Sequence, residues 1–380
     1  MRFQGFRQIS VACAVIALVV DLCSTAIAPL LPTLDHELGL GHALAGLLVA
    51  FYGIGYMIGT YPALRFTSWF GLVPTTMIGT GLAVVGSLTF AFSSNFEVLC
   101  AGRVCGGFGS VVVYTGILSI ASTTAGTERR GSAIGMVYSG TYAGSAIGPL
   151  LGSAADAFGR TIIFGLLSLV QLVIVGFVTR LPKLPPDPIA SLRTTFGYLR
   201  FRRALIALWI TGIPPFGLGV LVVSGSYRII ETGGSALLIA IAFSGMAVLY
   251  VFSSPTLGRI SDVRGRRQPI IFLMLLATLP LLLLTLADVP IPTVALIAIG
   301  GTLFTLVGGP SFALLSDSVQ ERGGTAVEST FLMNLYWGPS AALGAILAGI
   351  FHGVFGAELS FLFLAGTTVA SAGLVARYIR

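Results

Sequence analysis

Charged residues are scarce in this sequence. They make up 9% of its 380 residues, whereas hydrophobic residues make up 55%. A soluble globular domain carries about 25% charged residues, so this composition excludes a soluble fold. The apolar runs recur about every 30 residues, and each approaches the roughly 20 residues that a helix needs to cross the hydrocarbon core of a bilayer.

Twelve such runs predict an all-α integral membrane protein. Their approximate ranges are 9–31, 43–64, 72–92, 97–122, 131–155, 161–181, 203–226, 235–257, 268–287, 291–315, 325–350 and 358–378. A membrane β-barrel is excluded because its strands are about ten residues long and alternate in hydropathy, whereas these runs are continuous. The first run is too long for a cleaved signal peptide and is interpreted as the first helix.

Acidic residues are fewer than basic ones, 14 against 21, and the basic residues are unevenly placed. If the amino terminus is cytoplasmic, 18 of the 21 lie on that side, Arg160 and Arg228 lie on the other, and Arg103 lies within a span. The asymmetry predicts that both termini lie in the cytoplasm. We expect the protein in a bacterial-type inner (plasma) membrane. Short basic loops that face anionic lipid explain the net charge of +7, so we expect no nucleic-acid partner.

Potential metal ligands and catalytic groups are also few. The four cysteines lie in spans one and four without a metal-ligand spacing, so no metal and no cofactor are expected. His36, His42 and His352 all fall near the outer side, which excludes a central histidine proton relay and favours surface positions. No span holds a nucleophile–base pair or a phosphate loop, so we expect no enzyme.

The longest polar connection, LPKLPPDPIASLRTTFGYLRFRR, divides the sequence. It predicts an amino-terminal six-helix half over 1–181, a cytoplasmic linker over 182–202 and a carboxy-terminal six-helix half over 203–380. TERRGSAIG, from residue 127, resembles QERGGTAVE, from residue 320, at an offset of 193, and Gly71 matches Gly265 at an offset of 194. The halves are therefore predicted to be pseudo-symmetric, an arrangement typical of transporters with a site near the midplane.

The stretch GRISDVRGRR joins the eighth and ninth spans. Glycines at both ends of its pattern permit a tight turn, and its aspartate can accept hydrogen bonds from a helix amino terminus. It resembles the signature loop, G-x-L-x-D-x-x-G-R-R/K, of the major facilitator superfamily. The resemblance implies the twelve-helix fold of that superfamily and a gating loop whose aspartate docks near Gly131 in one state. The residues concerned are Gly258, Asp262, Gly265, Arg266 and Arg267.

Charges inside the membrane are limited to two candidates. RVCGGFG, from Arg103, resembles the R-x-x-x-G-x-G motif of the same superfamily. A buried arginine costs about 2.5 to 3.5 kcal/mol on insertion scales, so we expect it to face the bundle interior with a partner. Asp21, the one carboxylate deep in a span, is the best candidate, and we interpret this pair as proton-coupling residues. The alternative is a permanently ionised Asp21 that only neutralises Arg103.

The fifth span is rich in glycine. Gly140, Gly144, Gly148 and Gly152 recur every fourth residue, which predicts a stripe for close helix packing, expected at the junction between the halves. Ordinary packing explains one such pair more readily than four. From Gly135 the pattern is G-x8-G-x3-G-P-x2-G-S, which resembles the antiporter motif of drug:proton antiporters and implies export. The motif residues are Gly135, Gly144, Gly148, Pro149 and Gly152.

Polar and aromatic residues at mid-span positions suit a cavity for amphipathic or aromatic molecules. Any single one is more often a packing residue, but two Tyr–Tyr pairs at i,i+4 each present two rings to one face. The predicted substrate-cavity residues are Ser24, Thr25, Tyr52, Tyr56, Tyr114, Tyr138, Tyr142, Trp209, Phe216, Asn334, Tyr336 and Trp337.

Together, the resemblance implies a proton-coupled secondary active transporter that exports drugs or metabolites by alternating access and functions as a monomer. Its partners would be a small-molecule substrate, protons and the lipid bilayer. One alternative is an uptake symporter or facilitator for a sugar or similar nutrient, and another is a transport-dead membrane sensor. The identity and charge of the substrate cannot be read from the sequence.

Overall fold

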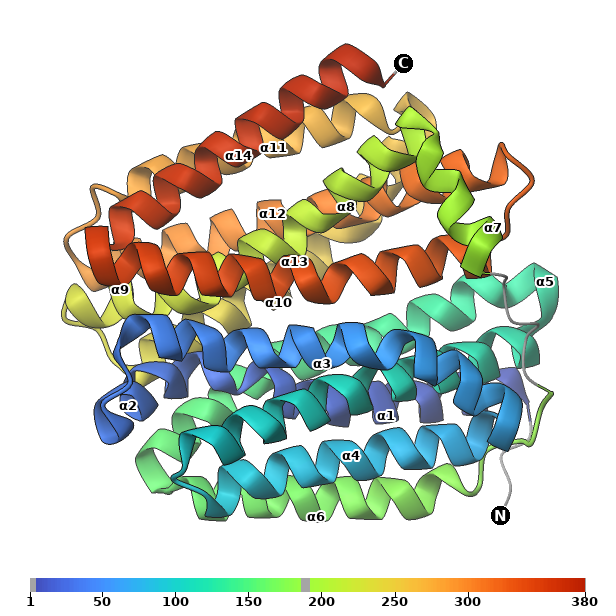
Figure 1. The fold of residues 1–380 in the computed structure, drawn as a ribbon, viewed down its shortest axis with the longest axis horizontal. Coiled ribbons are helices and arrows are strands. Elements are labelled where there is room, and N and C mark those ends of the chain that lie inside the picture. Colours follow the sequence, from blue (N-terminus) through green and yellow to red (C-terminus); the bar gives the residue numbers. More distant parts are fainter. Residues whose placement is uncertain (1–4, 186–191, 380) are drawn as a thin grey trace. The chain divides into compact units, whose positions relative to one another are not determined.

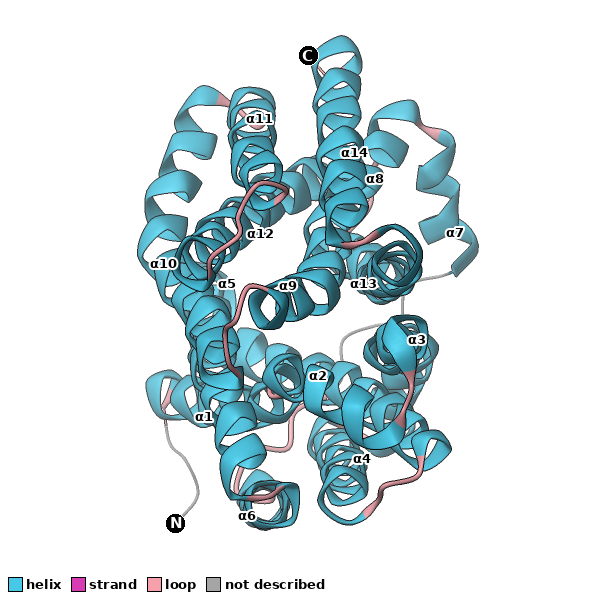
Figure 2. Cartoon of the chain, turned by 90° about the vertical axis from the view of Figure 1, so that its left-hand side faces the viewer, coloured by secondary structure: helices cyan, strands magenta, loops and turns pink. Residues whose placement is uncertain are grey.

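A computed structural model describes residues 5–185 and 192–379, apart from the side chains of residues 127, 128 and 326 (Figure 1). In these ranges the chain is helical almost throughout and contains no strand (Figure 2). Eleven helices there are long and apolar enough to cross a membrane. The remaining predicted span, 131–155, is the second part of α5 (Phe96–Phe158), which Gly126 divides with a φ of 68°. The predicted all-α fold with twelve membrane helices is confirmed.

The helices fall into two compact units, one of residues 1–30 and 54–189 and one of residues 31–53 and 190–380. The elements from the first half of the sequence are α1 (Phe6–Thr25), α2 (Ile27–Leu38), α3 (Gly41–Phe70), α4 (Leu72–Phe92), α5 and α6 (Arg160–Val178). Those from the second half are α7 (Leu192–Gly197), η1 (Tyr198–Arg200), α8 (Arg202–Val220), η2 (Leu221–Gly225), α9 (Ser226–Glu231), α10 (Ala236–Arg264), α11 (Arg267–Leu284), α12 (Pro290–Gln320), α13 (Ala326–Phe355) and α14 (Ala357–Tyr378).

In the first unit, α1 packs along α5, and α4 lies against both α5 and α6. Buried aliphatic side chains such as Ile16 and Ile117 form the core between these helices. The first membrane span is interrupted where α1 ends at Thr25 and α2 begins two residues later. Pro29 explains the interruption, because it has no N–H to donate to the Thr25 carbonyl. The end of α1 thus lies within the length of the span.

In the second unit, α8 packs against α12 and α13, while α11 packs against α12 and α14. Residues 31–53, from near the start of the chain, also belong to this unit. Glycines in this segment pack closely against the backbone of α13. A Cβ atom on Gly46 would lie 2.5 Å from the Ala345 carbonyl oxygen, and a Cβ atom on Gly53 would overlap the Gly338 carbonyl oxygen. Helix α3 therefore divides its length between the units, with its first part packed on α13.

Glycines with positive φ mark equivalent turns in the two halves of the sequence. Gly71 and Gly265, 194 residues apart, precede α4 and α11 with φ of 85° and 80°, which confirms their predicted match. Gly126 and Gly323 are 197 residues apart and have φ of 68° and 78°. The predicted match of TERRGSAIG with QERGGTAVE at offset 193 is therefore wrong by about one helical turn. Residues of that first stretch lie in α5, whereas Gly324 lies in the turn before α13.

Part of the predicted linker is helical. Residues 186–191 lie outside the described residues, but α7 and η1 follow them and contact the start of α13. The hydroxyls of Thr195 and Tyr198 donate to the Glu328 carboxylate at 3.3 and 3.5 Å. Burial, followed by the neighbouring charge of Glu328, raises the pKa of Tyr198. Glu328 also forms a reciprocal capping box with Thr325, so it fixes both the helix start and the linker.

Replacement of Thr325 by alanine is expected to lower the free energy of unfolding by about 1 kcal/mol, because the cap of α13 loses its acceptor for the Glu328 backbone N–H. Thermal unfolding of the purified protein in detergent measures the change. Thr367→Ala is a matched control, since the hydroxyl of the half-buried Thr367 donates within its own helix, to the Phe363 carbonyl at 2.8 Å. Equal destabilisation by the two variants would contradict the importance of the cap.

Candidate functional site

Asp21 lies in the last turn of α1 and is held by two serine hydroxyls. Ser24 Oγ donates to Asp21 Oδ1 at 3.3 Å, and Ser145 Oγ, from α5, donates to Oδ2. The Asp21 backbone carbonyl accepts hydrogen bonds from Ser24 Oγ and Thr25 Oγ1 at 3.0 and 2.8 Å. Because a hydroxyl can donate or accept, these serines can remain bonded to the carboxyl group whether it is ionised or protonated. The geometry therefore suits a group that exchanges a proton.

Arg103 lies in the first part of α5 and is buried, with 7% of its surface exposed. Its Nη1 donates to the Ser24 backbone carbonyl at 3.3 Å. The guanidinium thus approaches the turn of α1 that also presents Asp21, and its interior position agrees with the cost of an arginine in the membrane. A role for these two residues in proton coupling remains a prediction.

The glycine stripe of α5 packs against α1. A Cβ atom on Gly144 would lie 2.5 Å from the Leu18 carbonyl oxygen and 2.8 Å from Asp21 Cβ. The predicted location of this stripe, at the junction between the halves, is therefore wrong, since its partner belongs to the same unit. The close approach brings Ser145, which follows Gly144, into contact with Asp21. The glycines involved are Gly140, Gly144, Gly148 and Gly152, and the residues they meet are Ala14, Leu18, Asp21, Leu22 and Thr25 of α1 and Ala26 directly after it.

Two other residues of the antiporter-like motif lie differently. Gly135 has no described atom within 4 Å of its Cβ position, so close packing does not explain it. Pro149 lies within the helix, and the non-helical residue recorded in α5 is Gly126. The motif therefore combines glycines of α5 that pack against α1 with other positions, Gly135 among them, that lie outside this contact.

The predicted cavity residues of the first unit lie on three helices. Tyr114 and Thr141, on the two parts of α5, share a hydrogen bond of 2.9 Å between their hydroxyls. Tyr138 and Tyr142 lie half-buried on the second part of α5. Tyr56 lies on α3, beyond the point where that helix changes unit, and Ser24 and Thr25 lie beside Asp21.

The predicted cavity residues of the second unit lie on α3, α8 and α13. Trp209 Nε1 donates to Ser371 Oγ of α14 at 3.0 Å, and the Phe216 ring lies 6.3 Å from that of Phe363. The Tyr336 ring lies against Gly212 of α8, where a Cβ would overlap it. The remaining members, Tyr52, Asn334 and Trp337, are half-buried.

The signature loop forms a turn at Gly265, whose φ of 80° agrees with the predicted tight turn. The same prediction is wrong for Gly258, which lies inside α10 with open space at its Cβ position. Arg266 bridges two carboxylates, with Nη1 2.5 Å from Asp262 and Nε 3.4 Å from Asp317. Burial lowers the pKa of Arg266. The hydrogen bonds and charges of Asp262 and Asp317 together raise this pKa by a larger amount, so the net shift is upward.

The same loop also contacts the carboxy-terminal helix. Arg267 Nη2 donates to the Ala376 carbonyl of α14 at 2.5 Å. Together with the Arg266–Asp317 ion pair, this bond ties the turn between α10 and α11 to α12 and α14. The docking of Asp262 near Gly131 stays a prediction.

Two polar features of the first unit escaped the sequence analysis. One is Ser145, and the other is a buried cluster in which Gln171 Nε2 donates to Cys23 Sγ at 3.1 Å and Ser87 Oγ donates to Gln171 Oε1 at 3.0 Å. Gln171 is fully buried in the middle of α6. An amide in the centre of an apolar run is the signal that would have found this cluster.

The histidines differ in their surroundings. His36 is exposed, which agrees with its predicted surface position. His352 is buried, with 4% of its surface exposed, and its Nε2 lies 2.7 Å from Glu231 Oε1. The predicted surface position is therefore wrong for His352, because the end of α13 is covered by α3 and α9 residues of the same unit.

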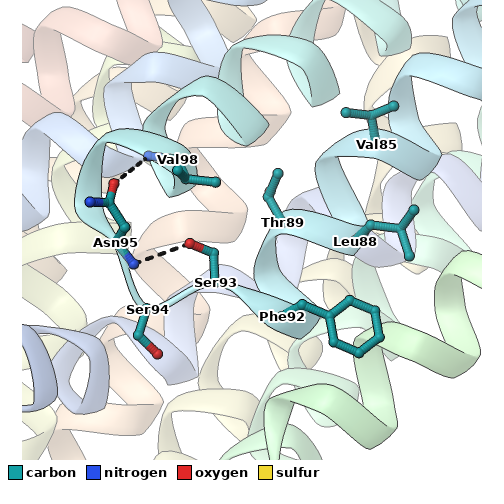
Figure 3. A pocket seen from close by; sticks show the side chains of 8 residues that line it. All are labelled: Val85, Leu88, Thr89, Phe92, Ser93, Ser94, Asn95 and Val98. Atoms are coloured by element: carbon teal, nitrogen blue, oxygen red, sulfur yellow. Dashed lines mark hydrogen bonds between the residues drawn. The ribbon is translucent and has the colours of Figure 1, made fainter.

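A hollow of about 610 Å³ lies at the turn between α4 and α5 (Figure 3). Asn95 accepts a hydrogen bond from the Val98 backbone N–H there and caps α5, while Ser93 Oγ accepts one from the Asn95 backbone N–H. These bonds explain the polar side chains as helix-end structure. None of the predicted site residues lines this hollow, whose lining is Val85, Leu88, Thr89, Phe92, Ser93, Ser94, Asn95 and Val98.

The family model of the Major Facilitator Superfamily matches residues 13–338. The chain belongs to the Major Facilitator Superfamily. Members are multi-pass membrane transporters, which agrees with the eleven membrane-length apolar helices of the described residues, with the second part of α5 and with the signature turn at Gly265.

The superfamily relatives include proteins named for different activities. The chain is similar to the MFS-type transporter YbcL of Bacillus subtilis, with 27% identity over 67% of this chain and 58% of that protein. It is also similar to Multidrug resistance protein 1 of Bacillus subtilis, with 26% identity over half of each chain. The matched region thus spans between about a third and three fifths of the length of the first curated relatives.

Solved structures show the same fold over almost the whole chain. The D-xylose-proton symporter superposes with a TM-score of 0.78 at 16% identity, covering 98% of this chain and 97% of that one. A bacterial homologue of the lysosomal transporter Spinster superposes with a TM-score of 0.76 at 13% identity, covering 98% and 95%. At these identities the likeness concerns the fold alone.

Proposed function

We propose that this superfamily member is a proton-coupled exporter of small organic molecules that works by alternating access as a monomer. We also propose a bacterial-type inner membrane, with both termini in the cytoplasm as the distribution of basic residues indicates. The observation that carries the proposal is the Asp21 carboxylate, which is held by Ser24 and Ser145 on the α1–α5 pair. An ionisable group inside a membrane bundle is a functional candidate by default.

In the proposed cycle, Asp21 binds a proton and a cationic substrate in turn. Protonation from the outside displaces the substrate, deprotonation to the cytoplasm prepares the site, and the halves rock about it. Ser24 and Ser145 keep their hydrogen bonds in both states by rotating their hydroxyls. A neutral or anionic substrate would depend instead on Arg103, whose Nη1 already bonds the Ser24 carbonyl.

The direction of transport rests on two supports. The pattern from Gly135 to Gly152 resembles the motif of drug:proton antiporters, and some relatives, including Multidrug resistance protein 1 and Efflux pump DEP3 of Fusarium langsethiae, are named for export. The alternative is uptake of a nutrient, and one relative is named for a nutrient: the riboflavin transporter RfnT of Brucella anthropi is 29% identical over 38% of this chain.

Everted membrane vesicles from a host that lacks its own drug exporters separate these possibilities. With the lumen acidified, an exporter accumulates a fluorescent cation such as ethidium several-fold above vesicles without the protein, and a protonophore abolishes the gain. Parallel assays with neutral and anionic dyes report the substrate charge. Accumulation only in right-side-out vesicles would show uptake, and substrate-independent proton flux in both orientations would contradict coupled transport.

A further inference from the structure

A second cluster of titratable side chains lies in the second unit, whereas Asp21 belongs to the first. It joins the first turn of α3, the end of α9 and the last turn of α13 through His42, Glu231 and His352. His352 Nε2 lies 2.7 Å from Glu231 Oε1, and the His42 and His352 rings are stacked with centroids 4.7 Å apart. One potential ligand atom from each of the three residues lies within 4.8 Å of the others.

The cluster contains an unsatisfied nitrogen. The His352 side chain is 2% exposed, and its Nδ1 is buried without a hydrogen-bond partner in the described structure. A buried polar atom without a partner is costly, so a functional reason for keeping it is expected. An imidazole nitrogen with a free lone pair is the commonest protein ligand of transition metals.

We propose that His42, Glu231 and His352 bind a divalent transition-metal ion, with Zn²⁺ as the best fit. Two imidazoles and one carboxylate are a ligand set that Zn²⁺ accepts, at about 2.0 to 2.2 Å from each ligand atom. Ligand atoms on a tetrahedral ion of that size lie about 3.4 Å apart, so the cluster needs only side-chain rotation to close around it. Glu231 has 41% of its side chain exposed, which leaves an approach for the ion and a water ligand. Mg²⁺ and Ca²⁺ prefer all-oxygen sites and fit poorly.

The neighbouring residues are compatible with metal binding. The Tyr227 ring lies 4.4 Å from the His42 ring, and its hydroxyl donates to Asp35 Oδ2 at 2.7 Å, so it forms a fixed wall beside His42. Arg228 competes for Glu231 at 3.7 Å. It contacts the Glu358 carboxylate more closely, at 3.0 Å, and can therefore release Glu231 to an ion.

The bound ion would join α3 to α9 and α13. Residues 31–53 come from the first half of the sequence but lie in the same compact unit as α13 in this structure. In the proposed alternating access the sequence halves rock against each other, which would separate residues 31–53 from α13. Zn²⁺ is therefore expected to hold these helices together and slow transport. This consequence rests on the proposed function, whereas metal binding itself does not.

Calorimetric titration of the full-length protein in detergent, after removal of metals with a chelator, tests the site with Zn²⁺ alone. We expect one ion per chain with a micromolar or tighter Kd, and at least about tenfold weaker binding by His42→Ala and His352→Ala. His36→Ala is the matched control and should bind as the wild type does, because His36 is exposed outside the cluster. His352→Gln, which retains a hydrogen-bond donor to Glu231, replaces the alanine variant if that variant does not fold.

The absence of Zn²⁺ binding by the wild type, or equal binding by all histidine variants, would overturn the site. With Zn²⁺ enclosed in the lumen of the everted dye-transport vesicles, which the outer side faces, transport by the wild type should slow several-fold and transport by His42→Ala should be spared. Undiminished transport with Zn²⁺ bound would overturn the effect on transport. Vesicles that move no dye would count against the proposed function, while the calorimetry still decides whether the metal site exists.

Discussion

Replacement of Asp21 by asparagine is expected to reduce proton-driven dye accumulation in everted vesicles to the background of vesicles without the protein. In asparagine the amide oxygen can accept from one of Ser24 and Ser145, and the NH₂ group can donate to the hydroxyl oxygen of the other, so the α1–α5 contact is retained. The amide cannot bind and release a proton near neutral pH, so coupling is lost. Binding of a neutral dye, or its exchange without a proton gradient, should persist.

The matched control for this variant is Asp288→Asn, which removes a carboxylate that is 90% exposed and forms only a long contact with Arg228. Because exposed ion pairs contribute little, this control should transport at the wild-type rate. Full proton coupling in Asp21→Asn, measured as dye-dependent proton release from the vesicles, would leave Asp21 as a structural partner of the Arg103 turn and refute its role as a proton carrier.

Alanine at Gly140 is expected to destabilise the protein strongly. A Cβ atom there would overlap the Ala14 carbonyl oxygen and lie 2.8 Å from Ala14 Cα, so backbone, and not a flexible side chain, must move. Overpacking of this kind costs about 1 to 3 kcal/mol and moves α5 away from α1. We expect a lower unfolding temperature in detergent and a lower yield of monodisperse protein.

Gly135→Ala, in the same helix, is expected to leave the unfolding temperature unchanged or to raise it. Its Cβ position has no described neighbour within 4 Å, so alanine adds helix propensity of up to about 1 kcal/mol without a clash. The two substitutions are chemically identical and differ in their surroundings. Equal unfolding temperatures for them would show that the stripe does not make the close contact with α1.

Hydropathy alone predicted the membrane spans, because a helix of about twenty consecutive apolar residues has the length and the surface that the hydrocarbon core of a bilayer requires. It did not predict the break between Thr25 and Ile27, although Pro29 is its cause, since a proline near a span end is also compatible with a continuous helix. It also placed the glycine stripe at the wrong contact. A stripe of small residues indicates that a backbone approaches, but it does not identify which helix provides that backbone.

The candidate site residues that the sequence did not connect are far apart along the chain. Ser145 is 124 residues from Asp21, and serine is common in membrane helices, so no local pattern connects them. His42 and His352 carry no ligand spacing that a motif could detect, and they meet only through packing of α3 on α13. The repeat match from residue 127 failed for a related reason. A short run of similar letters cannot distinguish registers that differ by one helical turn, whereas positive-φ glycines can.

Because α3 is divided between the two units, part of its packing can form only late in biosynthesis. The contacts of residues 41–53 with α13 cannot form until residue 326 and those after it have been made, more than 270 residues after Gly53. At about 5 to 20 residues per second, that interval is roughly 14 to 55 s. During this time the glycine face of Gly46 and Gly53 lies in the membrane without the partner it has in the finished protein. The nascent chain therefore depends on lipid or on the insertion machinery to cover that face until translation is nearly complete.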